Sequence, residues 1–135
     1  MQSASMKCLI VDDSETDRLM MERVLHKQSM KLDLRVAKTL TEARSLMREE
    51  GIRLVFLDNT LPDGIGANFL KEMKDYRQRN DVTVILVSDW PSPFMFAKAR
   101  AQNVRAIWNK RDFTIEAVRR VLRERVAADA MDYAH

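Results

Sequence analysis

The sequence has a single cysteine among its 135 residues, and it has no long hydrophobic run. Cys8 therefore has no partner for a disulfide within the chain, which excludes a disulfide framework and favours a buried thiol in a reducing compartment. No apolar stretch approaches the roughly 20 residues of a membrane-spanning helix. Residues 1–5 lack the basic and apolar regions of a signal peptide. These absences predict a cytoplasmic protein that does not enter a membrane.

The chain also has little net charge, because 23 basic and 20 acidic residues leave only +3. This balance gives no argument for binding to nucleic acid or to a membrane surface. A composition that is 46% hydrophobic and 32% charged predicts a folded globular protein. No repeat, low-complexity tract or linker divides the chain, so we expect one domain over residues 1–135, with a core at about 6–128 and a tail at 129–135.

Short apolar runs alternate along the chain with segments of helical periodicity. The runs predict strands at 7–11, 53–57, 82–87 and 104–108. At 32–37, apolar and polar residues alternate as in an exposed edge strand. The intervening segments predict five helices, at 14–28, from 39 to a stop at Gly51, at 67–77, at 94–102 and from 113 to about 128. In the last helix, one apolar stripe that we expect to face the core contains Ile115, Val118, Leu122 and Val126. Ser14 and Asp17 have the spacing of a capping box at the start of the first helix. The alternation predicts an α/β protein in which a doubly wound, five-stranded parallel sheet lies between helices as a three-layer sandwich.

Four of the five predicted strands end at residues suited to phosphoryl transfer: Asp12 and Asp13 after the first, Asp58 after the third, Ser88 after the fourth and Lys110 after the fifth. Parallel strands place their carboxyl ends along one edge of the sheet, so we expect these side chains to converge. Clustered carboxylates repel one another, and a hard divalent cation such as Mg²⁺ relieves that repulsion. One carboxylate could then attack phosphorus while a lysine shares the transferred charge.

Each of these residues has a common structural explanation when it is taken alone. An Asp pair after a strand often caps a helix, a lone Asp such as Asp58 often belongs to a turn, and a lone Lys such as Lys110 is usually a surface residue. The prediction therefore depends on their joint occurrence at four strand ends in this order.

This order of residues resembles the receiver domain of two-component response regulators, over about residues 6–128. The resemblance implies a flavodoxin-like, receiver-type fold in which Asp58 is the phosphoacceptor. It also implies that Lys110 binds the phosphoryl group and that Ser88 supplies the switch hydroxyl. The phosphoryl donor would be a histidine kinase or a histidine phosphotransfer protein, and the domain would catalyse only its own phosphorylation and dephosphorylation.

The resemblance also implies a Mg²⁺ site. Asp12, Asp13 and Asp58 would hold the ion together with the backbone carbonyl of Thr60, with Asp13 a more direct ligand than Asp12. The segment from Leu61 to Gly64 matches the loop that follows the acceptor in this family. Phosphorylation would shift the domain between two conformations and so signal to a downstream protein. Since no output domain follows, we expect a stand-alone regulator.

Three residues depart from the family's pattern. Asp89 follows the switch hydroxyl, where a small residue is usual, and should repel an incoming phosphoryl group unless it turns to solvent. Ile107 replaces the aromatic switch residue, and strand alternation places Trp108 on the opposite face of the sheet. Arg111 replaces a proline that is commonly cis, and because a cis bond without proline costs about 2.5–4 kcal/mol, we expect a trans peptide. These departures leave open a receiver-like interaction module that works without phosphorylation.

A phosphatase and a nucleic-acid-binding protein have weaker support. The segment 57–61 echoes the Asp-x-Asp-x-Thr signature of haloacid dehalogenase phosphatases, but Phe56 occupies the position of their nucleophile. The last helix is rich in arginine, which could indicate nucleic-acid binding. Acidic residues are interspersed with these arginines, which favours a solvated helix face with i,i+4 pairs, or half of a symmetric homodimer contact, involving Arg119, Arg120, Arg123, Arg125, Glu116 and Glu124.

Overall fold

The computed structural model describes residues 5–49 and 51–134. Residues 1–4, 50 and 135 lie outside the described residues, and with them most of the segment considered as a signal peptide and both ends of the predicted domain. Five parallel strands form one sheet in the order β2-β1-β3-β6-β7. These strands are β1 (Met6–Val11), β2 (Leu32–Ala37), β3 (Leu54–Asp58), β6 (Thr83–Ser88) and β7 (Ala106–Asn109). Every predicted strand is confirmed within two residues.

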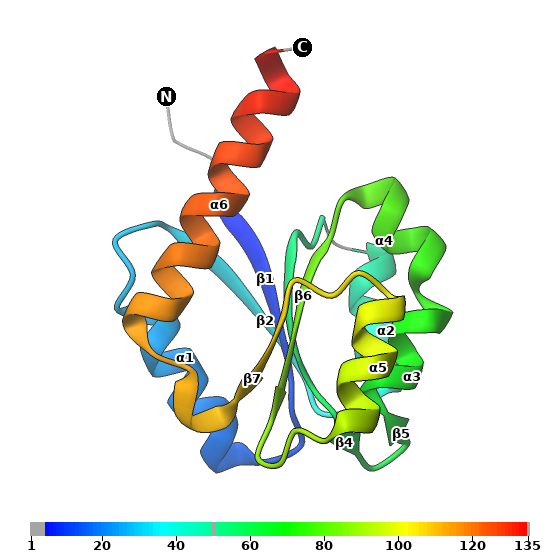
Figure 1. Cartoon of the computed structure of the whole chain (residues 1–135). Coiled ribbons are helices and arrows are strands. Elements are labelled where there is room, and N and C mark those ends of the chain that lie inside the picture. The colour runs from blue at the N-terminus through cyan, green and yellow to red at the C-terminus, as the bar shows by residue number, and fades with distance from the viewer. Residues whose placement is uncertain (1–4, 50, 135) are drawn as a thin grey trace.

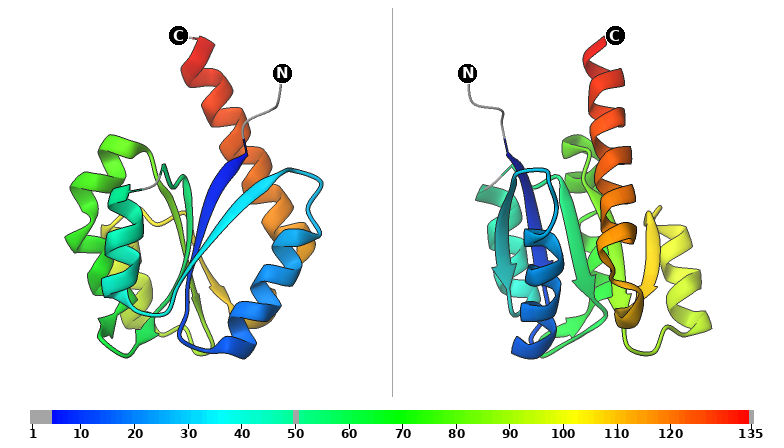
Figure 2. Two further views of the ribbon diagram at one scale, coloured as in Figure 1. Left: turned by 180° about the vertical axis from the view of Figure 1, so that it is seen from behind. Right: turned by 90° about the vertical axis from the view of Figure 1, so that its left-hand side faces the viewer.

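Helices cover both faces of this sheet, as Figures 1 and 2 show. One face carries α1 (Glu15–His26) and α6 (Ile115–Ala134), and the other carries α2 (Leu40–Glu49), α3 (Gly66–Glu72), α4 (Lys74–Asn80) and α5 (Pro93–Ala101). The alternation of β1 divides the core between them: Leu9 and Val11 pack on the α2 to α5 side, and Cys8 and Ile10 pack on the α1 and α6 side. The predicted three-layer sandwich is confirmed.

The predicted number of helices was wrong, because the single helix expected at 67–77 is two helices that break at Met73. The guanidinium of Arg77 is buried at this break, and its Nη2 donates to the carbonyl of Leu70. In a continuous helix that carbonyl would accept from the amide of Lys74. A side chain that enters the hydrogen-bond ladder in this way is a known cause of helix breaks. The described residues therefore contain six α-helices, together with the 3₁₀-helix η1 (Lys110–Asp112).

The last helix is longer than the periodicity predicted, since α6 runs to Ala134 and includes most of the segment expected to be a tail. Its final turns extend past the edge of the sheet at which the chain begins (Figure 2). Val126, expected on the buried stripe, is therefore 44% exposed, whereas Arg125, expected on a solvated face, is buried. Within residues 5–49 and 51–134, no helix combines the length and the apolarity that crossing a membrane requires.

The opposite edge holds the carboxyl ends of all five strands and lies at the bottom of Figure 1. The segment after β3, predicted to be a loop, is a small antiparallel hairpin of β4 (Thr60–Leu61) and β5 (Gly64–Ile65). Asp63, at its tip, accepts hydrogen bonds from the amides of Leu40 and Thr41 at the start of α2. These bonds lower the pKa of Asp63 and fix the hairpin against α2. The chain directly after Asp58 is therefore held in place.

Candidate functional site

The adjacent ends of β1 and β3 bring three carboxylates together. The pairing of Val11 with Leu57 places Asp12 beside Asp58. One oxygen each from Asp12, Asp13 and Asp58 lie within 4.8 Å of one another. Asp12 is fully buried, Asp58 is 8% exposed, and Asp13 faces solvent. The predicted convergence of the three carboxylates is thus what the structure shows.

Lys110 enters this cluster from the end of β7, where η1 directs it inward. It is only 9% exposed, and its Nζ lies 3.0 Å from Asp12 Oδ2 and 3.7 Å from Asp58 Oδ2. The peptide between Lys110 and Arg111 is trans, as expected. The lysine therefore reaches the acidic cluster without the proline that the resemblance implied at position 111.

A fourth carboxylate, from Asp17, lies in the same cluster and was not predicted as a site residue. The capping-box prediction is only half correct: Ser14 Oγ accepts from the amide of Asp17 at 3.3 Å, but the Ser14 amide donates to Asp12 Oδ1 at 2.9 Å. The Asp17 carboxylate instead accepts from Lys110 Nζ at 2.5 Å. Asp17 lies in the first turn of the helix that follows the Asp pair, and this position was the sequence signal for the role.

The remaining predicted residues line an open cleft of about 550 Å³ above the cluster. Thr60 and Ser88 lie in its wall together with Asp13, Asp58 and Lys110. Ser88 is 8% exposed, and its Oγ accepts from the amide of Trp90 at 3.2 Å, which leaves its O–H able to donate into the cleft. All six predicted site residues therefore meet at this edge, five in the cleft wall and Asp12 beneath them.

Asp89 also borders the cleft. Its side chain is 63% exposed, and its Oδ2 lies 3.9 Å from Lys110 Nζ. The carboxylate therefore adds negative charge at the mouth of the cleft while it stays largely solvated.

Burial and the neighbouring charges shift the pKa values of the residues in the cluster. Burial raises the pKa of Asp58 to about 6, helped by the neighbouring Asp12 and opposed by Lys110. Burial also raises the pKa of Asp12. For Lys110, burial alone would lower the pKa, but hydrogen bonds to Asp17 and Asp12 outweigh it and raise the pKa. The cluster thus holds more negative charge than one lysine neutralises.

The arrangement fits a hard divalent cation. Asp12 Oδ2 is fully buried, and the charged group beside it is the ammonium of Lys110, 3.0 Å away. The donor set offered by Asp12, Asp13 and Asp58 consists only of oxygen, which suits Mg²⁺. A cation there would bind this buried oxygen and reduce the repulsion between the carboxylates.

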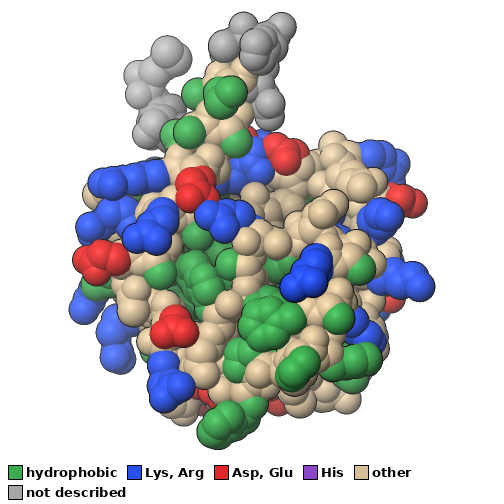
Figure 3. Space-filling view, viewed as in Figure 1, with side chains coloured by type: hydrophobic (Ala, Val, Ile, Leu, Met, Phe, Trp, Pro, Cys, Tyr) green, Lys and Arg blue, Asp and Glu red, His purple; other side chains and the backbone are tan. Residues whose placement is uncertain are grey.

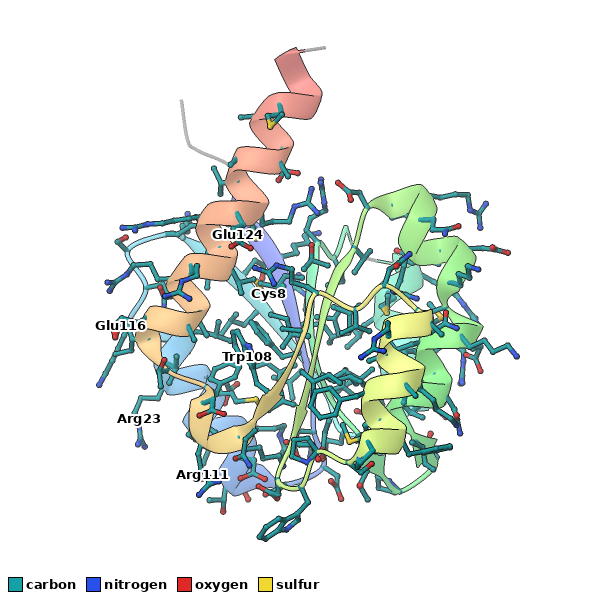
Figure 4. The ribbon with its side chains drawn as sticks, viewed as in Figure 1. Cys8, Arg23, Trp108, Arg111, Glu116 and Glu124 are labelled. Carbon is teal, nitrogen blue, oxygen red and sulfur yellow. The ribbon has the colours of Figure 1, made fainter. Side chains whose placement is uncertain are left out.

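The residues before Lys110 take opposite faces of β7, as strand alternation predicted. Ile107 packs against the core on the α2 to α5 side, and Trp108 packs on the other side. The Trp108 ring contacts Phe56 and Phe113 at centroid distances of 6.1 and 5.9 Å and points toward α6 in Figure 4. Trp108 therefore lies on the face opposite to position 107, where the resemblance implied an aromatic residue.

Comparison with known proteins identifies this architecture. The family model described as the response regulator receiver domain matches residues 8–123. The response regulator protein PilR of Pseudomonas aeruginosa is 37% identical over 79 residues, which cover 58% of this chain and 17% of PilR. The chain thus spans about a sixth of the length of this relative.

Solved structures agree with the match. A CheY-like response regulator receiver domain protein from Methanospirillum hungatei superposes with a TM-score of 0.78 at 21% identity, covering 93% of this chain and 99% of that chain. The Mn²⁺-bound form of response regulator Rcp1 gives a TM-score of 0.73 at 19% identity, covering 86% and 91%. At these identities the likeness concerns the fold. Receiver domains bind Mg²⁺ at an acidic pocket, which Asp12, Asp13 and Asp58 form here. With its family model matched over most of its length, the chain belongs to the response regulator receiver domain family.

Proposed function

We propose that this chain is a stand-alone response regulator receiver that accepts a phosphoryl group on Asp58 from a histidine kinase or a histidine phosphotransfer protein. The observation that carries the proposal is the position of Asp58: its carboxylate lies in an open cleft, 3.7 Å from the buried ammonium of Lys110 and within the acidic cluster. This geometry pairs a nucleophilic oxygen with a cation able to stabilise a phosphoryl group.

The covalent change in the transfer involves only Asp58 and the phosphoryl donor. An oxygen of Asp58 forms a bond to phosphorus while the bond from phosphorus to the donor histidine nitrogen breaks, and the electron pair of that bond stays on nitrogen. With a pKa of about 6, Asp58 is mostly ionised and nucleophilic at pH 7.5. Lys110 and the hydroxyl of Ser88 then bind the oxygens of the new acyl phosphate. The chain therefore acts on itself, in phosphorylation and dephosphorylation, rather than turning over an external substrate.

A Mg²⁺ ion belongs to the proposed site. Asp12, Asp13 and Asp58 would hold it together with the backbone carbonyl of Thr60, with Asp13 in more direct contact than Asp12. Such an ion would neutralise negative charge that Lys110 alone does not balance.

The output of this receiver is proposed to be a conformational change read by a downstream protein partner, in the cytoplasm and without contact with nucleic acid or membrane. On α6, basic and acidic side chains alternate in Figure 3 rather than forming one basic surface. Glu116 pairs with Arg119, and Arg105 of the loop before β7 pairs with Glu124. Since some receiver domains dimerise, this helix could also form a homodimer contact. Because Ile107 replaces the usual aromatic residue, the signal would leave Ser88 by another route.

Phosphorylation is tested with purified protein, acetyl phosphate and Mg²⁺, analysed by Phos-tag electrophoresis. One slowly migrating species is expected for the wild type, and none for Asp58→Asn or in the presence of EDTA. Asp75→Asn is the matched control, because Asp75 is an exposed carboxylate on α4 that does not line the cleft. This variant should label like the wild type. Labelling of Asp58→Asn would show that the acceptor is assigned to the wrong residue.

A phosphorylation-independent interaction module is the second candidate, and Asp89 is the observation that favours it. Its carboxylate 3.9 Å from Lys110 repels an incoming phosphoryl group and competes for the same ammonium. Beryllofluoride, which mimics a phosphoryl group, separates the two candidates. A change in tryptophan fluorescence on its addition supports the receiver, since Trp90 borders the site in sequence and is 86% exposed. No change, together with no labelling, supports the interaction module.

A further inference from the structure

The ammonium of Lys110 has four carboxylates around it, and the one it contacts most closely is not the acceptor. Its Nζ lies 2.5 Å from Asp17 and 3.0 Å from Asp12. The distance to Asp58 is 3.7 Å. The outermost carboxylate, from Asp89, lies at 3.9 Å. Lys110 is thus drawn toward α1 and away from the residue that would carry the phosphoryl group.

The elements on both sides hold this contact in place. Asp17 lies in the first turn of α1, where the Ser14 hydroxyl accepts from its amide, and its side chain is 28% exposed. Lys110 is 9% exposed and belongs to η1, so its backbone is fixed directly after β7. A charge-assisted hydrogen bond between partly buried groups is stronger than one between solvated groups. The pair therefore has a definite resting geometry rather than being one of many surface arrangements.

We propose that Asp17 is a positioning residue, which holds Lys110 against α1 in the unphosphorylated protein and gives it up when a phosphoryl group is present on Asp58. The inference rests on the proposed function, since it concerns the same acceptor. A phosphoryl group carries more negative charge than one carboxylate and presents more acceptor oxygens, so it competes successfully for the ammonium. Asp17 does not touch the reacting atoms and acts only through Lys110.

This role has a measurable consequence. Part of the free energy of binding a phosphoryl group is spent on breaking the contact between Lys110 and Asp17. Replacing Asp17 by a neutral isostere removes that cost, so binding of a phosphoryl mimic becomes tighter. At a fixed, saturating concentration of Mg²⁺, we expect Asp17→Asn to bind beryllofluoride three- to tenfold more tightly than the wild type. This change lowers log Kd by about one unit or less.

The measurement is a beryllofluoride titration of the full chain followed by tryptophan fluorescence. Glu15→Gln is the matched control, because Glu15 is an exposed carboxylate in the same turn of α1 and does not line the cleft. It should leave the affinity within twofold of the wild type. Asp17→Glu keeps the charge and should bind more weakly than Asp17→Asn.

A double-mutant cycle with Lys110 distinguishes positioning from plain repulsion between Asp17 and the bound anion. In a Lys110→Gln background, Asp17→Asn should change the affinity less than twofold, because the residue through which Asp17 acts is gone. If Lys110→Gln does not fold, as judged by a thermal unfolding transition, Lys110→Ala is used for the same cycle. A full three- to tenfold effect in either background overturns the proposal, since it would show that Asp17 repels the ligand directly.

The failure of this inference differs from the failure of the proposed function. If the wild type neither binds beryllofluoride nor becomes labelled, the receiver function itself fails. If the wild type binds and Asp17→Asn binds equally or more weakly, the function stands and the positioning role of Asp17 is wrong.

Discussion

Gly66 packs directly against the backbone of the proposed acceptor. A Cβ atom at this position would lie 2.4 Å from the carbonyl oxygen of Asp58 and 3.1 Å from Cγ of Leu57. The amide of Gly66 donates to the carbonyl of Asn59 at 2.7 Å, which fixes the close approach. The start of α3 therefore supports the strand end that presents Asp58.

Gly66→Ala should both destabilise the fold and displace the acceptor. The added methyl group meets backbone rather than a side chain that could turn away, so we expect a loss of about 1–3 kcal/mol in the free energy of unfolding. Urea denaturation followed by circular dichroism measures this loss, and slower acetyl phosphate labelling reports the displaced carboxylate. Gly51→Ala is the control, because nothing lies within 4 Å of a Cβ there. Equal stability of the two variants would contradict this account of Gly66.

At the scale of elements, α6 is anchored by Arg125, which was predicted to lie on a solvated helix face. Arg125 is 5% exposed, and its Nη2 lies 2.5 Å from carboxylate oxygens of Asp81 and Asp129. Its Nη1 donates to the carbonyl of Asp81 and to Thr83 Oγ1, at the start of β6. The arginine thus ties the late turns of α6 to the edge of the sheet opposite the site.

Arg125→Ala should destabilise the protein strongly and leave the chemistry of the site intact. Removing one partner of a buried pair costs about 3–5 kcal/mol, and we expect a smaller loss because Asp81 and Asp129 are partly solvated. Chemical denaturation measures the loss, with Arg120→Ala as the control on the exposed face of the same helix. Folded Arg125→Ala should still bind beryllofluoride. A loss no larger than that of the control would show that the network does not anchor α6.

The sequence predicted the strands and helices well where the hydrophobic pattern alone determines them. Apolar runs predicted four of the strands, because burial on both faces leaves few polar residues in a parallel strand. The edge strand β2 was predicted from its alternation of apolar and polar residues. Periodicity could not reveal the break at Met73, which depends on Arg77 reaching the Leu70 carbonyl from the following turn. Periodicity also could not reveal that α6 extends past the edge of the sheet. Val126 was therefore predicted to be buried, although it is 44% exposed.

At the site too, the sequence predicted what the sheet topology determines and missed what depends on side-chain packing. Strand-end positions predicted the convergence of Asp12, Asp58 and Lys110, because the topology of a parallel sheet determines it. Asp17 was interpreted as a helix-capping residue, and its spacing is equally compatible with both roles. Only the position of the lysine ammonium decides between them, and that position is a property of tertiary packing.

At the scale of the whole molecule, the edge that bears the site is strongly acidic although the chain as a whole is slightly basic. Asp89 is a carboxylate at the mouth of the cleft that takes no part in the proposed chemistry. Asp89→Ala should therefore speed labelling by acetyl phosphate several-fold, because it removes a charge that repels the anionic donor. The effect should shrink as salt is added, since this carboxylate is largely solvated. A rate that is unchanged at low salt would show that Asp89 has no part in controlling access.

The acidic edge also makes stability depend on pH in the absence of metal. The pKa of Asp58 is raised to about 6 by burial and by Asp12, from about 3.9 in an unfolded chain. A raised pKa means that the native state holds the proton more tightly, so this contribution to stability is complete below about pH 3.9 and is lost as the pH rises through 6. Since each pKa unit corresponds to about 1.4 kcal/mol, the loss amounts to at most roughly 3 kcal/mol.

Asp58→Asn should remove this dependence. In EDTA, wild-type stability should fall more steeply than that of Asp58→Asn between pH 4 and 7.5, so that the variant becomes the more stable protein at neutral pH. Urea denaturation at several pH values measures both slopes. Saturating Mg²⁺ should flatten the wild-type slope and raise its Tm at pH 7.5, because a cation that binds the ionised carboxylates stabilises the native state by mass action. The variant should gain less from Mg²⁺, and parallel slopes in EDTA would mean that Asp58 titrates normally and does not share the buried charge of Asp12.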